Sequence, residues 1–366
     1  MARVLAGAGV SGYEAGVADV VEGLTRDLAD EIRRDKLGNL IMLKRGEGSV
    51  ARGGGSPGRG EGSSGRGEGG PSSPKIMLAA HMDEIGLMIT RIEKEGALRF
   101  TQVGGIDQRI LPGQEVIVHG RRELPGVIGA KPPHIQEPDE NKKAVKMENL
   151  YIDVGMTREE LEKAVSVGDI ATFRRQPVFL KNDFLAGKAL DDRAGVGVLF
   201  ECLKRLQSIR HQADVYCVAT VQEEVGIRGA MVSTYGVTPD IGIAIDVGHG
   251  EMPTVPEYLT LNMGKGPAIA FGPQVHPKIF DTLTAVAKEE GIPYQVEPSP
   301  HPGGTDAWAI QVTREGVPSA LISIPLRYMH TSVETVSLED IKRGGQLLAS
   351  FIARVDHEFL EGLRCF

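Results

Sequence analysis

A chain of 366 residues is too long for one ordinary hydrophobic core, so we expect two domains. Its hydrophobic content of 41% and charged content of 25% are typical of a soluble globular protein, and its net charge of −8 argues against nucleic acid as the main partner. No apolar stretch approaches the roughly 20 residues that span a bilayer, and glycines with Glu14 interrupt the N-terminal segment, so we predict a cytoplasmic location and no membrane partner. Three widely spaced cysteines, Cys202, Cys217 and Cys365, predict neither a disulfide framework nor a thiolate metal site.

The chain begins with a predicted helix. The pattern Ser11-Gly-Tyr-Glu14 predicts a capping box, and apolar residues with helical spacing follow it from Val17 to Leu28. Two predicted strands come next, NLIMLK at 39–44 and KIMLAA at 75–80. The intervening segment 46–74 consists almost entirely of Gly, Ser, Pro, Arg and Glu, which cannot bury enough apolar surface to offset the entropy of ordering. We therefore predict a hairpin whose turn is a long flexible loop.

Residues 86–175 predict a small all-β domain. Short strand-like runs such as GLMITRI and QEVIVHG are separated by Gly and Pro, and one helical patch, TREELEKAV, interrupts them. This domain is predicted to be inserted into an α/β domain built from 1–85 and 176–366.

Strands and helices alternate after residue 175. Such alternation predicts an α/β layer with a parallel or mixed sheet flanked by helices. The predicted helices are 192–207, 277–290, 305–314 and a last one from Ser337 onward, and the predicted strands are 215–222, 241–246, 292–297 and 319–325.

Metal-ligating residue types follow five of the strand-like runs. Ligands of open α/β sheets bind outside the carboxyl ends of the strands, and imidazole with carboxylate, without thiolate, is what a divalent metal ion prefers. The clusters are His81-Met-Asp83-Glu84, Asp191-Asp192, Glu223-Glu224, Asp246 and His330.

Each cluster also has a purely structural interpretation. Asp191-Asp192 could cap a helix, Asp246 could be a turn residue, and the adjacent Glu223 and Glu224 could lie in a solvated loop. Five such strand ends together favour a metal site, because so many acids in one crevice repel one another unless cations neutralise them. Strand alternation then predicts different roles for the two adjacent glutamates.

The motifs HMDEIG, GKALDDRAG, QEEVG, AIDVG, GGTDA and RYMH resemble those of the tetrahedral aminopeptidase and glutamyl aminopeptidase family of dinuclear metallopeptidases. The resemblance covers nearly the whole chain except 46–74. It implies a zinc-peptidase-like α/β domain with an inserted β-barrel-like domain, and a metal-dependent aminopeptidase acting on peptides. It also implies a large homo-oligomer, a tetrahedral dodecamer, and a cis peptide bond between Asp191 and Asp192.

The resemblance further implies a role for each site residue. Asp191 would bridge two divalent ions per subunit, either zinc or cobalt, with manganese as a further candidate. The implied ligands are His81, Asp191 and Asp246 for one ion and Asp191, Glu224 and His330 for the other. Glu223 would be the general base, and Asp83 would accept the second ring N–H of His81 and fix its tautomer.

Alternatives remain at this level. A carboxypeptidase or amide deacylase of the same architecture, an endoglucanase and an inactive scaffold each account for part of the pattern. The preferred N-terminal residue is not predicted. His249 and His301 are expected to be rim residues, and Trp308 after GGTDA stands where a smaller residue is expected.

Overall fold

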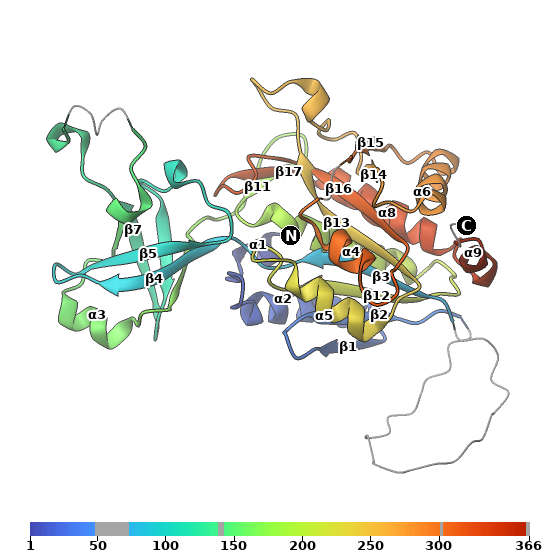
Figure 1. The fold of residues 1–366 in the computed structure, drawn as a ribbon, viewed down its shortest axis with the longest axis horizontal. Helices are drawn as coiled ribbons and strands as arrows, with labels where there is room; N and C mark the ends of the chain where they lie inside the picture. Colours follow the sequence, from blue (N-terminus) through green and yellow to red (C-terminus); the bar gives the residue numbers. More distant parts are fainter. Residues whose placement is uncertain (48–72, 138–142, 301–302, 364–366) are drawn as a thin grey trace, which may run out of the picture.

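The computed structural model describes residues 1–47, 73–137, 143–300 and 303–363. Most of the predicted flexible loop 46–74 therefore lies outside the described residues, as do His301 and Cys365. Two bodies are visible, a helix-flanked sheet and a smaller barrel at one end of the molecule (Figure 1).

The larger body is built on a mixed sheet, with eleven strands in the described part of the chain. These are β1 (Glu31–Arg34), β2 (Leu40–Lys44), β3 (Lys75–His81), β10 (Val178–Phe179), β11 (Phe184–Gly187), β12 (Asp214–Thr220), β13 (Ile241–His249), β14 (Ala268–Phe271), β15 (Gln295–Pro298), β16 (Ser319–Arg327) and β17 (Glu334–Ser337). They run in the order β1-β2-β12-β3-β13-β16-β17-β11-β10, and β14 joins β15 to β16. The central strands β12, β3, β13 and β16 are parallel, so their carboxyl ends meet at one edge.

Helices cover both faces of this sheet. They are α1 (Ala2–Ala6), α2 (Ala15–Thr25), α4 (Leu190–Leu206), α5 (Arg228–Val237), α6 (Pro277–Glu289), α7 (Asp306–Gln311), α8 (Leu338–Ile352) and α9 (His357–Glu361), and a short 3-10 turn, η4, spans Glu257–Leu259. The central strands are buried on both faces, which explains their nearly continuous apolar runs. Helix α4 packs closely on α8 because Gly345 has no side chain; a Cβ there would lie 2.5 Å from the Cβ of Glu201.

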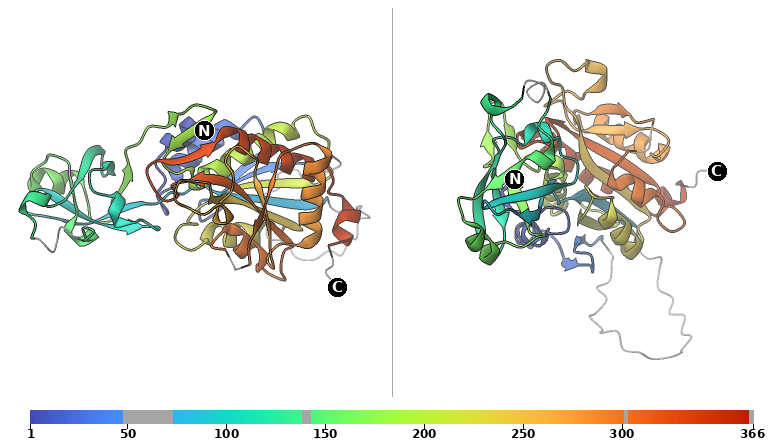
Figure 2. Two further views of the ribbon diagram at one scale, coloured as in Figure 1. Left: turned by 90° about the horizontal axis from the view of Figure 1, so that it is seen from above. Right: turned by 60° about the vertical axis from the view of Figure 1, so that its left-hand side comes forward.

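The smaller body is a closed barrel with its own hydrophobic core. Its strands are β4 (Gly86–Ile92), β5 (Ala97–Val103), β6 (Glu115–His119), β7 (Glu123–Gly129), β8 (Tyr151–Asp153) and β9 (Ile170–Phe173), in the order β4-β5-β8-β7-β6-β9, accompanied by α3 (Arg158–Ala164) and the 3-10 turns η1 (Gln108–Ile110), η2 (Pro133–Ile135) and η3 (Met147–Asn149). Figure 2 shows the barrel standing clear of the sheet and its helices. The predicted fold class is thereby confirmed, whereas the domain boundaries at 85/86 and 175/176 stay a prediction.

Two local predictions are wrong. The strands 40–44 and 75–81 do not form a hairpin, because β12 lies between them and pairs with both. Ser11 does not cap a helix; α2 begins after Glu14 without a side-chain cap, and the Ser11 hydroxyl bonds Asp83 instead. Strands β1, β8, β10, β11, β14 and β17 and helices α1 and α5 were not predicted.

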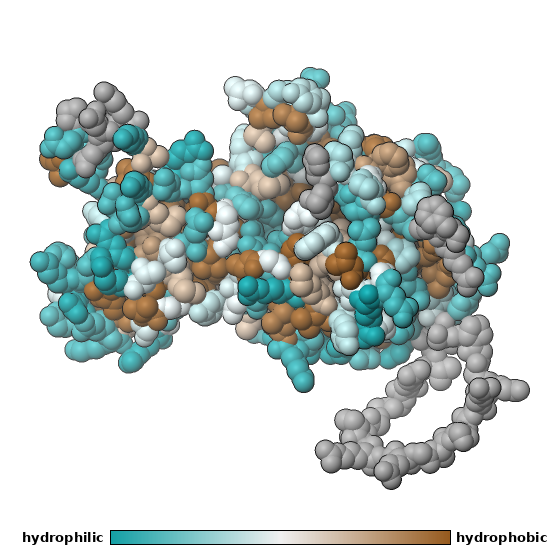
Figure 3. Space-filling model, in the orientation of Figure 1, coloured by the Kyte–Doolittle hydropathy of each residue, from teal (hydrophilic) through white to brown (hydrophobic). Residues whose placement is uncertain are grey.

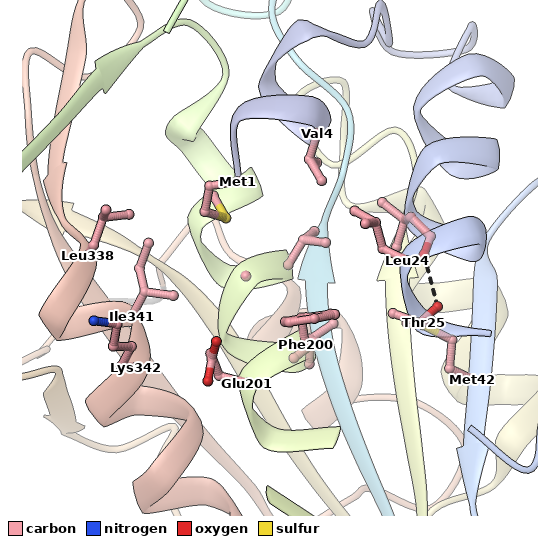
Figure 4. Close-up of a pocket in the computed structure, with 14 residues that line it drawn as sticks. Met1, Val4, Leu24, Thr25, Met42, Phe200, Glu201, Leu338, Ile341 and Lys342 are labelled. Carbon is pink, nitrogen blue, oxygen red and sulfur yellow. Dashed lines mark hydrogen bonds between the residues drawn. The ribbon is translucent and has the colours of Figure 1, made fainter. Parts of the chain in front are cut away.

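Two further features belong to the larger body. An apolar cavity of about 190 Å³ opens between α1, α2, α4 and α8, with Met1, Leu24, Phe200 and Ile341 in its lining (Figure 4). The connection from β13 to β14 projects at the top of Figure 1, and apolar surface gathers there in Figure 3, where Leu259 is 56% exposed. Every helix that the structure describes is too short or too polar to cross a membrane.

Candidate metal centre

The parallel strands bring the predicted ligands to one edge of the sheet. His81 is the last residue of β3 and pairs in register with Thr220 of β12. Ala79 of β3 pairs with Ala244 of β13, so His81 and Asp246, each two residues further on, lie side by side. Asp191 and Asp192 stand at the start of α4, and the peptide bond between them is cis, as predicted.

Asp191 lies between the two predicted histidine ligands. Its Oδ1 is 3.1 Å from Nε2 of His81, and its Oδ2 is 3.2 Å from Nε2 of His330. The ring of His330 also lies 3.5 Å from Oε1 of Glu224. One carboxylate thus holds two imidazoles, one on each oxygen.

Two sets of side chains have ligand atoms within 4.8 Å of one another, the distance expected around a cation. One set contains His81, Asp192 and Asp246, and the other contains His81, Asp191 and Glu224. These sets include four of the five predicted ligands, and the fifth, His330, adjoins them through Asp191 and Glu224. The geometry adds Asp192, for which no ligand role was predicted; its Oδ1 accepts the amide of Gly195, whereas its buried Oδ2 has no hydrogen-bond partner among the described residues.

The adjacent glutamates do not lie on a strand, which corrects the argument from strand alternation. Strand β12 ends at Thr220, and Gln222 then adopts a left-handed conformation with φ 55°. Both glutamate side chains are nevertheless buried, with 9% exposure for Glu223 and 6% for Glu224, so the solvated-loop interpretation is wrong as well. Oε2 of Glu223 lies 3.8 Å from Nε2 of His81.

Asp83 connects the glutamate turn to His81. Its Oδ1 lies 3.5 Å from Nδ1 of His81 and accepts the amide of Glu223 at 3.1 Å. Its Oδ2 accepts the amide of Glu224 at 3.2 Å and the hydroxyl of Ser11 at 2.6 Å. Burial opposes ionisation of Asp83, but the interaction with His81 and the hydrogen bonds from Ser11 and the Glu223 amide together outweigh it and lower the pKa of this carboxyl.

Burial disfavours the ionised form of the acids in the centre. It raises the pKa of Glu223 to about 9, of Asp246 to about 8 and of Glu224 to about 7, with neighbouring carboxylates adding to the effect. Burial also opposes ionisation of Asp191, but hydrogen bonds to His330 and His81 lower its pKa. So many acids that resist ionisation fit a site completed by cations.

Glu334 holds the backbone of two predicted ligands, and the sequence interpretation did not include it. It is 1% exposed, and its two oxygens accept the backbone amides of Asp191 at 3.1 Å and His330 at 2.9 Å. A further buried acid, Asp306 of the GGTDA motif, accepts the hydroxyl of Thr220 at 2.6 Å. The only available signal was the position of Glu334, four residues after a predicted ligand.

The barrel and the N-terminal segment also border the centre. A Cβ on Gly105, in the loop after β5, would lie 3.0 Å from the ring of His330. Buried Glu84 pairs with Lys188 at 2.5 Å and with Arg193 at 3.2 Å, and accepts the amide of Gly9. This ionic cluster ties the N-terminal segment to the base of the barrel insertion.

The remaining predicted neighbours stay outside the ligand cluster. The side chain of Trp308, on α7, is 43% exposed, so the indole does not fill the space behind the centre. His249 is exposed at the end of β13, consistent with a rim residue.

A mixed sheet with an acidic, histidine-containing centre at its carboxyl edge and an inserted barrel defines a class of peptide-bond hydrolases. The chain belongs to the M42 glutamyl aminopeptidase family, whose sequence pattern matches residues 64–347. It is similar to the lysyl aminopeptidase of Pyrococcus furiosus, with 38% identity over 93% of this chain and 92% of the relative.

Solved structures agree with this assignment. A TET aminopeptidase from a marine-sediment Thaumarchaeota archaeon has a TM-score of 0.88 and 34% identity, covering 99% of this chain and 98% of that chain. The TET1 peptidase of Pyrococcus horikoshii, which can assemble into a tetrahedron or a large octahedral shell, has a TM-score of 0.80 and 32% identity over 96% of this chain and 98% of that chain.

Proposed function

We propose that this chain is a metal-dependent aminopeptidase that releases N-terminal residues from peptides. The observation that carries the proposal is the Asp191 carboxylate, whose two oxygens each face a different histidine ring. A carboxylate placed in this way suits a bridge between two divalent ions, since each oxygen can serve one ion together with one imidazole.

The proposed ligands follow from this bridge. His81, Asp191 and Asp246 would hold one ion, and Asp191, Glu224 and His330 would hold the other. Zinc or cobalt fits the nitrogen and oxygen donors, with manganese as a further candidate. When bound, such a pair of ions provides a nucleophilic water at neutral pH and polarises a peptide carbonyl.

Glu223 is the proposed general base. It is buried beside His81, and Asp83 holds its backbone amide, so the carboxylate is fixed at the edge of the ligand cluster. In this role Glu223 takes a proton from the attacking water and delivers it to the leaving amine. Asp83 is the proposed positioning residue that orients the ring of His81.

The charge distribution favours an aminopeptidase over a carboxypeptidase. A carboxypeptidase needs a cation for the C-terminal carboxylate of its substrate. Lys188 and Arg193, the cations of the motif that contains Asp191, are both engaged with buried Glu84. An acidic crevice instead attracts the free ammonium group of a peptide N-terminus.

A panel of aminoacyl p-nitroanilides tests the proposal, assayed after chelation and again after return of each metal. Lysine belongs in the panel because the Pyrococcus furiosus relative is a lysyl aminopeptidase. We expect activity that is lost on chelation, restored by zinc or cobalt and abolished by N-acetylation of the substrate. Turnover of N-acyl substrates alone indicates a deacylase, and chelator-insensitive cellulose hydrolysis indicates an endoglucanase.

We also propose that the chain assembles into a closed homo-oligomer, a tetrahedral dodecamer. The proposal is supported by the assembly described for the TET1 peptidase of Pyrococcus horikoshii. Light scattering should then give a mass close to twelve times 39.3 kDa. A mass equal to that of a single chain contradicts it.

A further inference from the structure

A second acidic group lies further along the crevice, on the same face of the sheet as Asp246. In the parallel pair of β13 and β16, Asp246 is in register with Ser323, so both side chains point to the same face. The hydroxyl of Ser323 donates to Oε2 of Glu297 at 2.5 Å, which places this carboxylate on that face too. Glu297 comes from β15, beyond the ligand cluster.

The position of Glu297 along the crevice follows from Gly248. A Cβ built on Gly248 would lie 3.4 Å from Oε1 of Glu297, so this oxygen stands directly above the glycine. Gly248 is two residues beyond Asp246 on β13, and two residues of a strand span about 7 Å. The Glu297 carboxylate is therefore about one amino-acid side chain away from the metal ligand, toward the open end of the strands.

Glu297 has no strong cationic partner in the described part of the chain. No Lys or Arg among the residues that the structure describes pairs with it, and the titratable side chain that influences it is the exposed His249. Burial raises the pKa of Glu297 against the hydrogen bond from Ser323 and the influence of His249. A partly buried carboxylate without a strong cationic partner is stabilised most by a ligand that carries a positive charge.

The neighbouring surface suits the stem of a long basic side chain. Leu261 reaches the same point as Glu297, since its Cδ1 would lie 2.7 Å from a Cβ on Gly248. A lysine side chain places its apolar methylene groups along such surface and presents its ammonium group at the far end. In such an arrangement Leu261 would contact the methylene groups, and Oε1 of Glu297 would accept a hydrogen bond from the ammonium group.

We propose that Glu297 is a specificity-determining residue that selects substrates with a basic N-terminal side chain, lysine above all. This inference rests on the proposed aminopeptidase function and adds to it the class of residue released. The α-amino group of the substrate lies at the ligand cluster, and its side chain extends along β13 toward Glu297. Ser323 holds the carboxylate in place through its hydroxyl.

Lysyl and norleucyl p-nitroanilides provide a matched test, because norleucine has the four carbons of the lysine side chain without the ammonium group. For the native protein, we expect kcat/KM to be higher for the lysyl substrate. In Glu297→Gln, the ratio of the lysyl to the norleucyl value should fall by about tenfold or more, the effect of removing one partner of a partly buried charge pair. The ratio does not depend on how much of a variant is correctly folded.

Two further variants sharpen this test. Glu297→Lys should reverse the preference, so that a glutamyl substrate exceeds a lysyl one. Glu290→Gln is the matched control, because Glu290 accepts a serine hydroxyl from Ser350 at 2.6 Å in the same manner, but between α6 and α8. In Glu290→Gln, the ratio of the lysyl to the norleucyl kcat/KM should equal that of the native protein. An independent readout is calorimetric binding of free L-lysine and L-norleucine, in which only lysine should lose affinity in Glu297→Gln.

The outcomes separate this inference from the function on which it rests. If no aminoacyl substrate is hydrolysed in the presence of any metal, the proposed function fails. If norleucyl substrate is hydrolysed but the ratio is unchanged in Glu297→Gln, the function stands and this inference is overturned. Glu297 then only ties β15 to β16 through Ser323.

Discussion

The hydroxyl of Ser11 donates to Oδ2 of Asp83 at 2.6 Å, across 72 residues of sequence. Both residues are buried, with 7% and 0% exposure. This bond fixes the carboxylate that also holds the amides of Glu223 and Glu224. The N-terminal segment, which carries no proposed ligand, thereby supports the centre.

Ser11→Ala should weaken metal binding and lower kcat without unfolding the protein. Loss of the partner that orients a metal ligand reduces affinity by about 10- to 100-fold, and Ser11 holds that partner, Asp83, so we expect a reduction toward the lower end of this range. Metal affinity is measured by competition with a chelator, and kcat with the p-nitroanilide panel at saturating metal. The control is Ser233→Ala, since the Ser233 hydroxyl is equally buried but donates to the Gly229 carbonyl within α5. Equal metal affinity in both variants contradicts the prediction.

Glu334→Gln should loosen the second proposed ion site. A glutamine has one oxygen and cannot accept both amides, so the backbone of Asp191 or of His330 loses its anchor. We expect elemental analysis to show less than full metal content, with partial recovery of activity at excess zinc or cobalt.

Asp340→Asn is the matched control for Glu334→Gln. Asp340 is also fully buried and accepts two amides, those of Gly264 and Gly266, at 2.7 Å each. This variant should lose a similar amount of thermal stability while keeping its metal. If it loses metal to the same extent, Glu334 has no special role at the centre.

Changing each of the adjacent glutamates, Glu223 and Glu224, to glutamine should impair the enzyme in a different way. Glu223→Gln keeps its shape but cannot accept a proton, so metal stays bound while kcat falls by about 10²- to 10⁴-fold with little change in KM. Glu224→Gln removes a ligand, so one ion binds more weakly and excess metal restores part of the activity. Metal content and kinetics measured together distinguish the two. The opposite pattern means that the roles are exchanged.

Metal affinity should rise with pH between about 6 and 9. Glu223, Asp246 and Glu224 have pKa values raised to about 9, 8 and 7 in the metal-free chain, and the pKa of His330 is raised to about 9, chiefly by its hydrogen bond to Asp191. Metal binding must displace these protons. Chelator competition at several pH values, with proton release measured calorimetrically in two buffers, tests this; affinity independent of pH contradicts it.

The same groups determine how the stability of the metal-free protein depends on pH. A raised pKa means that the folded state favours the protonated form, and the stability gained is complete below the ordinary pKa. It is lost progressively as pH rises from the ordinary values, about 4, to the raised values of about 7 to 9, above which the group is ionised in both the folded and the unfolded state. The melting temperature of chelated protein should therefore fall over this range, and the difference from metal-loaded protein should widen.

The sequence by itself determined the chemistry of the centre and the class of the fold. Hydrophobic periodicity and turn residues are local properties, so they indicated the barrel-like domain, α4, α6 and α8, and the strands β3, β12, β13 and β16. The acidic residues and histidines after those strands predicted which types of ligand the site contains, because an unpaired acid is too costly to bury in an apolar core. The motif resemblance then implied which of them form the cluster.

Only the tertiary structure decided which distant segments meet. Strand β12 enters between β2 and β3 because it completes the parallel centre of the sheet, which no local pattern encodes. The Ser11 hydroxyl bonds a carboxylate 72 residues away, and Glu334 and Glu297 reach the crevice from strands whose sequences carry no motif. Side-chain hydrogen bonds depend on positions in space within a few tenths of an ångström, and those positions are set by the packing of the whole chain rather than by neighbours in sequence.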